Sequence, residues 1–509
     1  MDQKTKEIVN NIMNYVIGKG ASDEIKKNQH SVTKALSLSA DNLCLESIEN
    51  DLWQHILDRI KCFNRDELLF LAEFMRESFS ARLYPVALLY QFATINEIGI
   101  YISKIVLGNE LIFNNSLCMN LSKLKYLIDC IIFYDNVKTK IEYTKRNTLS
   151  VSIDDIFEPI KNEVVDSFFQ GYTLYLNSIK VEDMEISNPK LRQYLTDIHL
   201  TPEEIYKQAN PVIEDIIGFN YDDVDYLLYK IPYMMLNTTY SSDRENRFHI
   251  KIKRNDFIHF LKDDISEEHL IKVLEYLSIN HCINDGKHSN REVELRCITE
   301  DNGVLSFAIR TILECLGIFK RITITGHYMD EVTYSYQKTK LELHSSDLIK
   351  QQQAMSTYFS YVVAELFETY GYLIAKDSNG YPAVDIKDIT VNGSRLVFND
   401  IDVLAFNKNA NTIINCELKY YKVKMDYAGM TKDALDKEKY ESLLKRETTL
   451  KNNKSEIVKA VFGLSIPDSS IAVKSIVVTS RQNYNTKNIT EYNFEEFKRK
   501  LLNNENYRK

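Results

Sequence analysis

Two acidic residues and one lysine lie in apolar, strand-forming surroundings in the last quarter of the sequence. Asp402 lies within IDVLA at 401–405, and Glu417 and Lys419 lie within IINCELK at 413–419. A carboxylate in such surroundings is costly to bury without a partner. Two carboxylates on adjacent strands could share a divalent cation, and oxygen ligands suit Mg²⁺ or Mn²⁺. Such a set could perform metal-assisted hydrolysis of a phosphodiester bond.

The spacing of the second acid and the lysine indicates that they act together. Residues two apart on a strand point to the same face, so Glu417 and Lys419 share one face, and Cys416 and Leu418 point to the other. A lysine beside a metal-bound phosphate can orient the attacking water and offset developing negative charge. We therefore expect Asp402, Glu417 and Lys419 to meet on one face of a two-stranded hairpin.

The elements that must position these residues can be read from the same part of the sequence. Periodicity predicts a helix over 355–374, closed at Gly371, and polar NKNAN predicts a hairpin turn between two strands. A long charged helical stretch, one strand and one final helix follow. The expected strands cover 383–391, 395–406, 412–421 and 475–479, and the expected later helices cover about 432–462 and 491–502.

The segment NDIDVLAFNKNANTIINCELKYY resembles the core signature of the PD-(D/E)XK nuclease superfamily, in which an acid on the second strand precedes a (D/E)xK strand across a hairpin. The order helix, three strands, helix, strand over the last 155 residues is also similar to that family's core. The resemblance implies an α/β restriction-endonuclease-like fold and a Mg²⁺ or Mn²⁺ cofactor. It implies Asp402 and Glu417 as metal ligands, Lys419 as the catalytic lysine, and nucleic acid, with DNA preferred, as the substrate.

One part of the family pattern is different here. The stretch YFSYVVAELFETYGY is similar to the first helix of Mrr-like restriction nucleases, but Ser360 stands where they usually carry an acid. Glu365 and Glu368, about one turn apart on one face, are the available substitutes. We take Glu365 as the candidate third metal ligand and catalytic acid.

The first two thirds of the chain predict mainly helices. Apolar spacing such as Leu52, Ile56 and Ile60 indicates a helical bundle, and Thr201 followed by Pro202 predicts a helix start. The short β-prone runs FHIKIK, VELRCIT and RITITG suggest a mixed region that a winged-helix-like unit would fit. The expected division is a helical domain at 1–240, a mixed α+β domain at 241–345 and a nuclease domain at 346–509.

Composition bounds the class of protein and its partners. The net charge of −9 divides into +3 for residues 351–509 and −12 for residues 1–350, so the C-terminal part is the more permissive toward nucleic acid. No segment is apolar enough for a secretory leader or a membrane span, which predicts a cytoplasmic protein. The eight cysteines are scattered and predicted to be reduced packing residues. The helical region could join a partner subunit or a second copy.

Weaker candidates have ordinary explanations. His281, Cys282, His288 and Cys297 do not have the spacing of a zinc site. Lys422 and Lys424 could contact phosphates or simply end a solvated strand. The charged helical run with its lysines is interpreted as an exposed face, and the 32 tyrosines as packing residues. The chain has no Walker-type or GxGxxG glycine loop.

Three functions remain open on these grounds. The first is a metal-dependent nuclease acting on DNA, in the setting of prokaryotic restriction or antiviral defence. The second is a catalytically inactive nuclease-fold protein that serves binding or assembly, which Ser360 favours. The presence of Asp402, Glu417 and Lys419 together favours the enzyme. The third is a nuclease that acts on RNA.

Overall fold

The structure is a computed structural model of the chain. It describes residues 7–8, 11–12, 14–16, 22–39, 44–79, 89–108, 111–114, 120–144, 151–159, 184–238, 249–279, 296–308, 311–313, 315–317, 319, 338–420, 438–480 and 490–505. Among these residues, no helix combines the length and apolarity that a membrane span requires.

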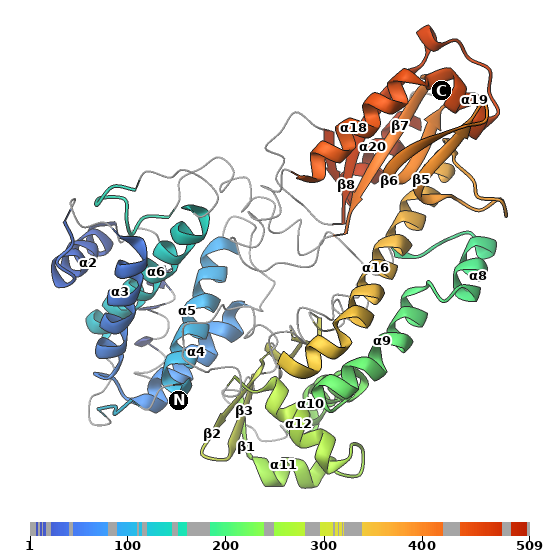
Figure 1. Cartoon of the computed structure of the whole chain (residues 1–509). Coiled ribbons are helices and arrows are strands. Elements are labelled where there is room, and N and C mark those ends of the chain that lie inside the picture. The colour runs from blue at the N-terminus through green and yellow to red at the C-terminus, as the bar shows by residue number, and fades with distance from the viewer. Residues whose placement is uncertain are drawn as a thin grey trace.

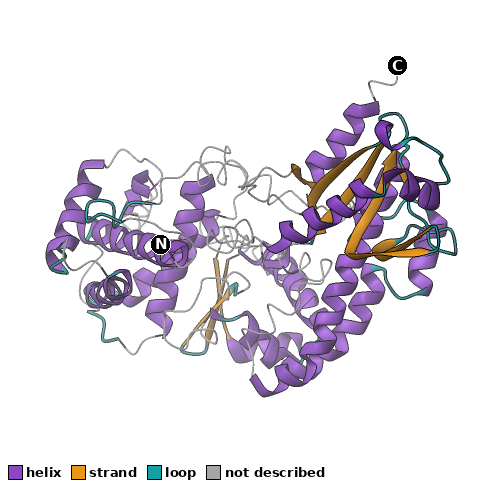
Figure 2. Cartoon of the chain, turned by 45° about the horizontal axis from the view of Figure 1, so that its top comes forward, coloured by secondary structure: helices purple, strands orange, loops and turns teal. Residues whose placement is uncertain are grey.

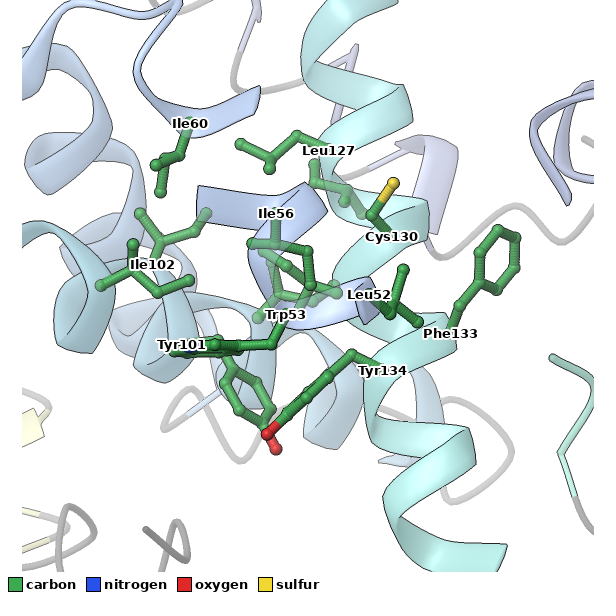
Figure 3. Close-up of a cluster of buried hydrophobic side chains, with 14 of the residues drawn as sticks. Leu52, Trp53, Ile56, Ile60, Tyr101, Ile102, Leu127, Cys130, Phe133 and Tyr134 are labelled. Carbon is green, nitrogen blue, oxygen red and sulfur yellow. The ribbon is translucent and has the colours of Figure 1, made fainter. Parts of the chain in front are cut away.

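The N-terminal region is helical, as its periodicity predicts. Its long helices are α2 (Ser22–Ala35), α3 (Leu45–Ile60), α4 (Arg65–Phe79), α5 (Leu89–Gly108) and α6 (Leu121–Thr144). They bury one apolar cluster, in which the rings of Trp53 and Tyr101 both pack against Tyr134 (Figure 3). The Asn64 side chain accepts hydrogen bonds from the amides of Asp66 and Glu67, which caps α4.

The middle of the chain combines helices with a small sheet. The elements are α8 (Pro189–Asp197), α9 (Pro202–Ile217), α10 (Tyr221–Thr238), β1 (His249–Lys253), α11 (Arg254–Leu261), α12 (Glu267–Leu277), β2 (Ile298–Asp301) and β3 (Val304–Ala308). The strands form an antiparallel sheet in the order β1-β3-β2. The helix start predicted at Thr201 is confirmed, since its side chain accepts a hydrogen bond from the amide of Glu204. The side chain of Ser266 caps α12 in the same way. The expected strand RITITG lies outside the described residues.

The C-terminal region is built on a mixed sheet with helices. Its elements are α16 (Lys338–Thr369), β4 (Leu373–Ile374), β5 (Val384–Val391), β6 (Ser394–Asn407), β7 (Thr412–Lys419), α18 (Glu438–Asn452), α19 (Lys454–Phe462), the 3-10 turn η6 (Asp468–Ser470), β8 (Ala472–Thr479), β9 (Thr490–Asn493) and α20 (Phe494–Glu505). The sheet order is β4-β6-β7-β8-β9, and β5 pairs with β6. The pair β6–β7 is antiparallel, whereas β7, β8 and β9 are parallel. The expected first helix, three strands and later strand are present as α16, β5 to β7 and β8. The structure differs from the expectation in three ways: α16 ends at Thr369 and is followed by the short strand β4, the charged helical stretch is divided into α18 and α19, and β9 follows β8 before the final helix.

Helices cover both faces of this sheet (Figures 1 and 2). On one face, Cys416 and Leu418 of β7 belong to the apolar cluster that α16 and α20 complete. On the other face, Ile413 belongs to the cluster that includes Leu450 of α18 and Ile457 of α19. The alternation along β7 thus directs odd-numbered residues toward α18. This arrangement decides which helix lies over the candidate residues.

The core clusters divide the chain differently from the three expected ranges. The boundary expected at 345/346 falls inside α16, a continuous helix in which Leu348 packs with the cluster of α9 to α12 and Met355 packs with the sheet. Leu191 and Leu195 of α8, from the range expected to be a separate helical domain, also pack with the sheet cluster. The polar stretch before residue 353 continues α16 because α9 packs against it.

Candidate active site

Asp402 lies in the middle of the sheet on β6. The register pairs Val403 with Cys416, so the next residues, Asp402 on β6 and Glu417 on β7, lie opposite each other. Its Oδ2 atom accepts a hydrogen bond from the amide of Leu418. This bond to the neighbouring strand fixes the carboxylate at the junction of β6 and β7.

Glu417 and Lys419 share a face of β7, as their spacing predicts. Lys419 Nζ lies 2.6 Å from Glu417 Oε1. The glutamate side chain is 7% exposed and the lysine side chain is 28% exposed. The lysine is therefore the member of the pair that solvent, and any molecule arriving from solvent, can reach.

Arg446 of α18 is a further member of the site that sequence reasoning missed. Its NH2 group donates to Glu417 Oε2, and its NH1 group donates to the backbone carbonyl of Asp400. The guanidinium is almost fully buried. A sequence signal was present, because Arg446 stands on the same helical face as Leu443 and Leu450, where an apolar residue is expected.

Asp385 of β5 is a second residue that sequence reasoning missed. The register places Val384 beside Val403 and Ile386 beside Ile401, so Asp385 lies across from Asp402. Its backbone is left-handed, with φ of 52°, next to the irregular part of the β5–β6 pairing. Thr357 Oγ1 of α16 donates to Asp385 Oδ2 at 2.9 Å. In the sequence, the feature that could have identified Asp385 is its place between Val384 and Ile386 in a predicted strand.

The neighbours of Asp402 affect its ionisation. Burial, followed by the negative charge of Glu417 and then that of Asp385, raises the pKa of Asp402 to about 7, although the amide of Leu418 and the charge of Lys419 act in the opposite direction. Burial also raises the pKa of Asp385. A carboxyl group in this state gains from a nearby cation, because the cation stabilises the ionised form.

Glu365 and Glu368 of α16 have partners elsewhere. The Glu365 carboxylate accepts the amides of Ser187 at 2.9 Å and Asn188 at 2.5 Å, and so anchors the segment that begins α8. Glu368 pairs with Lys376. Ser360 is buried, and its hydroxyl donates to a carbonyl one turn earlier in α16. These contacts of Glu365 do not include Asp402 or Glu417. The structure therefore does not bring Glu365, the expected third metal ligand, together with the other two acids.

The residues present fit a magnesium or manganese ion with few protein ligands. Within the described ranges, no three acidic, histidine or cysteine side chains come together as a preformed metal cluster. Mg²⁺, however, often takes only one or two carboxylates and completes its shell with water and substrate phosphate. Asp402 and Glu417 provide hard oxygen donors, and the pKa of Asp402 is raised first by burial and then by the negative charge of Glu417.

The weaker sequence candidates are not part of this site where the structure describes them. Lys422, Lys424, His281, Cys282 and His288 lie outside the described residues. Cys297 is buried, as are Cys130, Cys315 and Cys416. Lys445 and Lys451 of α18 are exposed, in agreement with a solvated helix face.

Comparisons with protein-family models, with curated proteins and with solved structures give no match to this chain.

Proposed function

We propose that the C-terminal region is a metal-dependent nuclease that hydrolyses phosphodiester bonds, with DNA as the substrate. The observation that carries this proposal is the meeting of Asp402, Glu417 and Lys419 on neighbouring antiparallel strands. Two carboxylates and one accessible ammonium are the groups that metal-assisted phosphodiester hydrolysis requires.

The arrangement of elements supports the same proposal. A helix, an antiparallel three-stranded unit, a helical segment and a parallel strand follow one another, with the acids on the second and third strands of the unit. This order is similar to the common core of the PD-(D/E)XK family. Because one fold can carry many functions, the side chains of the site and not the fold carry the argument.

Each residue has a defined task in this proposal. Asp402 and Glu417 would hold the ion, which when bound polarises the phosphate and lowers the pKa of a water molecule. Lys419 would contact the phosphate or the attacking water through its exposed ammonium, and so offset the negative charge that develops on the phosphate. Burial of Glu417 keeps bulk water away from one side of the site.

A second candidate function is a binding or assembly protein that has the nuclease fold without catalysis. The observation in its favour is that Glu365 is engaged by Ser187 and Asn188, so the helix does not supply an acid to the site. Restriction or antiviral defence remains the proposed setting for the nuclease, because a large region of other folds accompanies the candidate domain.

A cleavage assay separates these functions. The full chain is incubated with supercoiled plasmid, linear DNA and RNA, each with and without Mg²⁺, beside Asp402→Ala and Lys419→Ala. We expect Mg²⁺-dependent cleavage of DNA that falls roughly 10²-fold or more in each variant. The matched control is Asp388→Ala, which removes an acid from β5 that is paired with Arg395 at the surface.

Each outcome of this assay has one interpretation. Cleavage that survives both Asp402→Ala and Lys419→Ala would end the assignment of the site. Cleavage of RNA alone would identify the substrate as RNA. Binding of DNA without cleavage under any metal condition would favour the binding or assembly protein.

A further inference from the structure

The Glu417 carboxylate has a different cationic partner on each of its two oxygens. Lys419 Nζ contacts Oε1 at 2.6 Å, and the Arg446 guanidinium contacts Oε2. The two partners carry the same charge, but they come from different elements. Lys419 lies on the same strand as the glutamate, whereas Arg446 lies on α18.

Arg446 is held in place by more than the glutamate. Its second contact, to the carbonyl of Asp400, reaches β6 two residues before Asp402. The guanidinium of Arg446 thus links α18 to β6, just before Asp402, and to the side chain of Glu417 on β7. A guanidinium has rigid, directed donors, so it sets position as well as charge.

Lys419 is held far less firmly. Its side chain is 28% exposed, against 4% for Arg446, and an ammonium on a flexible four-carbon chain can turn toward solvent at little cost. Removing the buried Arg446 from Glu417 would instead leave a charged group in the interior without its partner, which is strongly unfavourable. Of the two cations, Lys419 is the one that can be displaced.

We infer that Arg446 is a positioning residue that fixes Oε2 of Glu417 and so leaves Oε1, where Lys419 lies, as the oxygen that a divalent cation takes. The inference rests on the proposed function, since it concerns the ion that the nuclease would use. With Oε1 occupied by an ion, Lys419 would lose its contact with Glu417, and its ammonium would be available to contact the phosphate of the substrate.

The inference makes opposite predictions for two substitutions that remove the same charge. Lys419→Met removes a competitor for Oε1, so Mg²⁺ and Mn²⁺ should bind several-fold more tightly. Arg446→Met removes the group that orients the carboxylate, so binding should weaken by about 10-fold or more, as when the group that orients a metal ligand is lost. If both residues acted only through charge, both substitutions would tighten binding.

The experiment is isothermal titration of the full chain with MgCl₂ and MnCl₂, without nucleic acid. Wild type, Lys419→Met and Arg446→Met are compared with Lys474→Met, which removes an exposed lysine of β8 in the same sheet and should leave the affinity unchanged. Far-ultraviolet circular dichroism confirms that each variant is folded. Tighter binding in Lys419→Met together with weaker binding in Arg446→Met is the expected result.

Arg446→Lys keeps the experiment decisive if Arg446→Met does not fold. This variant retains the charge and loses the second directed contact, so binding should again be weaker than in wild type. Binding equal to wild type in Arg446→Lys, or tighter binding in Arg446→Met, would overturn the positioning role. A wild-type chain that is folded and binds neither ion would instead contradict the proposed function itself.

Discussion

The N-terminal helices and the C-terminal sheet both bury ionisable side chains, but they satisfy them in different ways. In the helices, the Asp129 carboxylate accepts hydrogen bonds from the hydroxyl of Tyr15 at 2.6 Å and from the side-chain amide of Asn28 at 2.7 Å. Lys140 donates to the backbone carbonyls of Asp155, Ile156 and Glu158. These hydrogen-bond partners are uncharged groups of the protein itself.

The sheet gathers its ionisable groups around one another instead. Glu417 is paired with two cations, and burial together with the negative charge of Glu417 raises the pKa of Asp402. Positively and negatively charged side chains are thus in contact in this site, and the partly exposed Lys419 is accessible to solvent. The comparison teaches that a buried acid marks a candidate site when its partners are charged and exchangeable, and marks a structural group when they are neutral and fixed.

The largest expected difference between the regions is in catalysis. Asp402→Asn should lower Mg²⁺-dependent cleavage roughly 10²-fold or more, because the amide cannot serve as an anionic ligand. Asp129→Asn removes a buried acid from the helices and should leave the initial rate of plasmid cleavage within about twofold, since uncharged groups hold it. An equal loss in both variants would mean that the comparison does not separate function from structure.

The two lysines should differ in stability. Lys140→Met leaves three backbone carbonyls without their common donor in a buried setting, and we expect a loss of roughly 3 kcal/mol in the free energy of unfolding. Lys419→Met removes a partly exposed lysine and should change that free energy by about 1 kcal/mol or less. Urea denaturation followed by circular dichroism measures both. A larger loss for Lys419→Met would make this lysine a structural residue.

The stability of the folded chain should depend on pH through the titration of Asp129. Burial raises the pKa of Asp129 to about 6 in the folded chain, from an ordinary value near 4. The folded state therefore holds this proton more tightly than the unfolded state, and stability falls as pH rises between about 4 and 6, by roughly 2 to 3 kcal/mol in total. Denaturation curves across this range, compared with Asp129→Asn, measure the effect. A slope that persists unchanged in the variant would assign it to other groups.

The smallest expected effect concerns the acid of α16. Glu365→Gln keeps a hydrogen-bond acceptor near Ser187 and Asn188 but removes the charge, so we expect a loss of about 1 kcal/mol in stability. Its effect on cleavage should be far smaller than that of Asp402→Asn. Thermal unfolding and the plasmid assay are run on the same preparation. A loss of cleavage as large as that of Asp402→Asn would return Glu365 to the site.

The local order of strands and turns in the C-terminal region could be predicted from the amino-acid sequence. Apolar, strand-forming runs indicated β6 and β7, the polar NKNAN segment indicated the turn between them, and a spacing of two residues placed Glu417 and Lys419 on one face. Helix caps at Thr201 and Ser266 were equally predictable. These features depend on neighbours within a few residues, so the pattern alone carries them.

Contacts between elements far apart in the sequence determine which side chains belong to the site and which do not. Arg446 reaches Glu417 across 29 residues of sequence, Asp385 lies beside Asp402 through strand pairing, and Glu365 is drawn to a segment 177 residues earlier. The continuity of α16 through the expected domain boundary likewise depends on its packing against α9. A buried charge takes the partner that packing brings within reach, and no local period of the sequence contains that information.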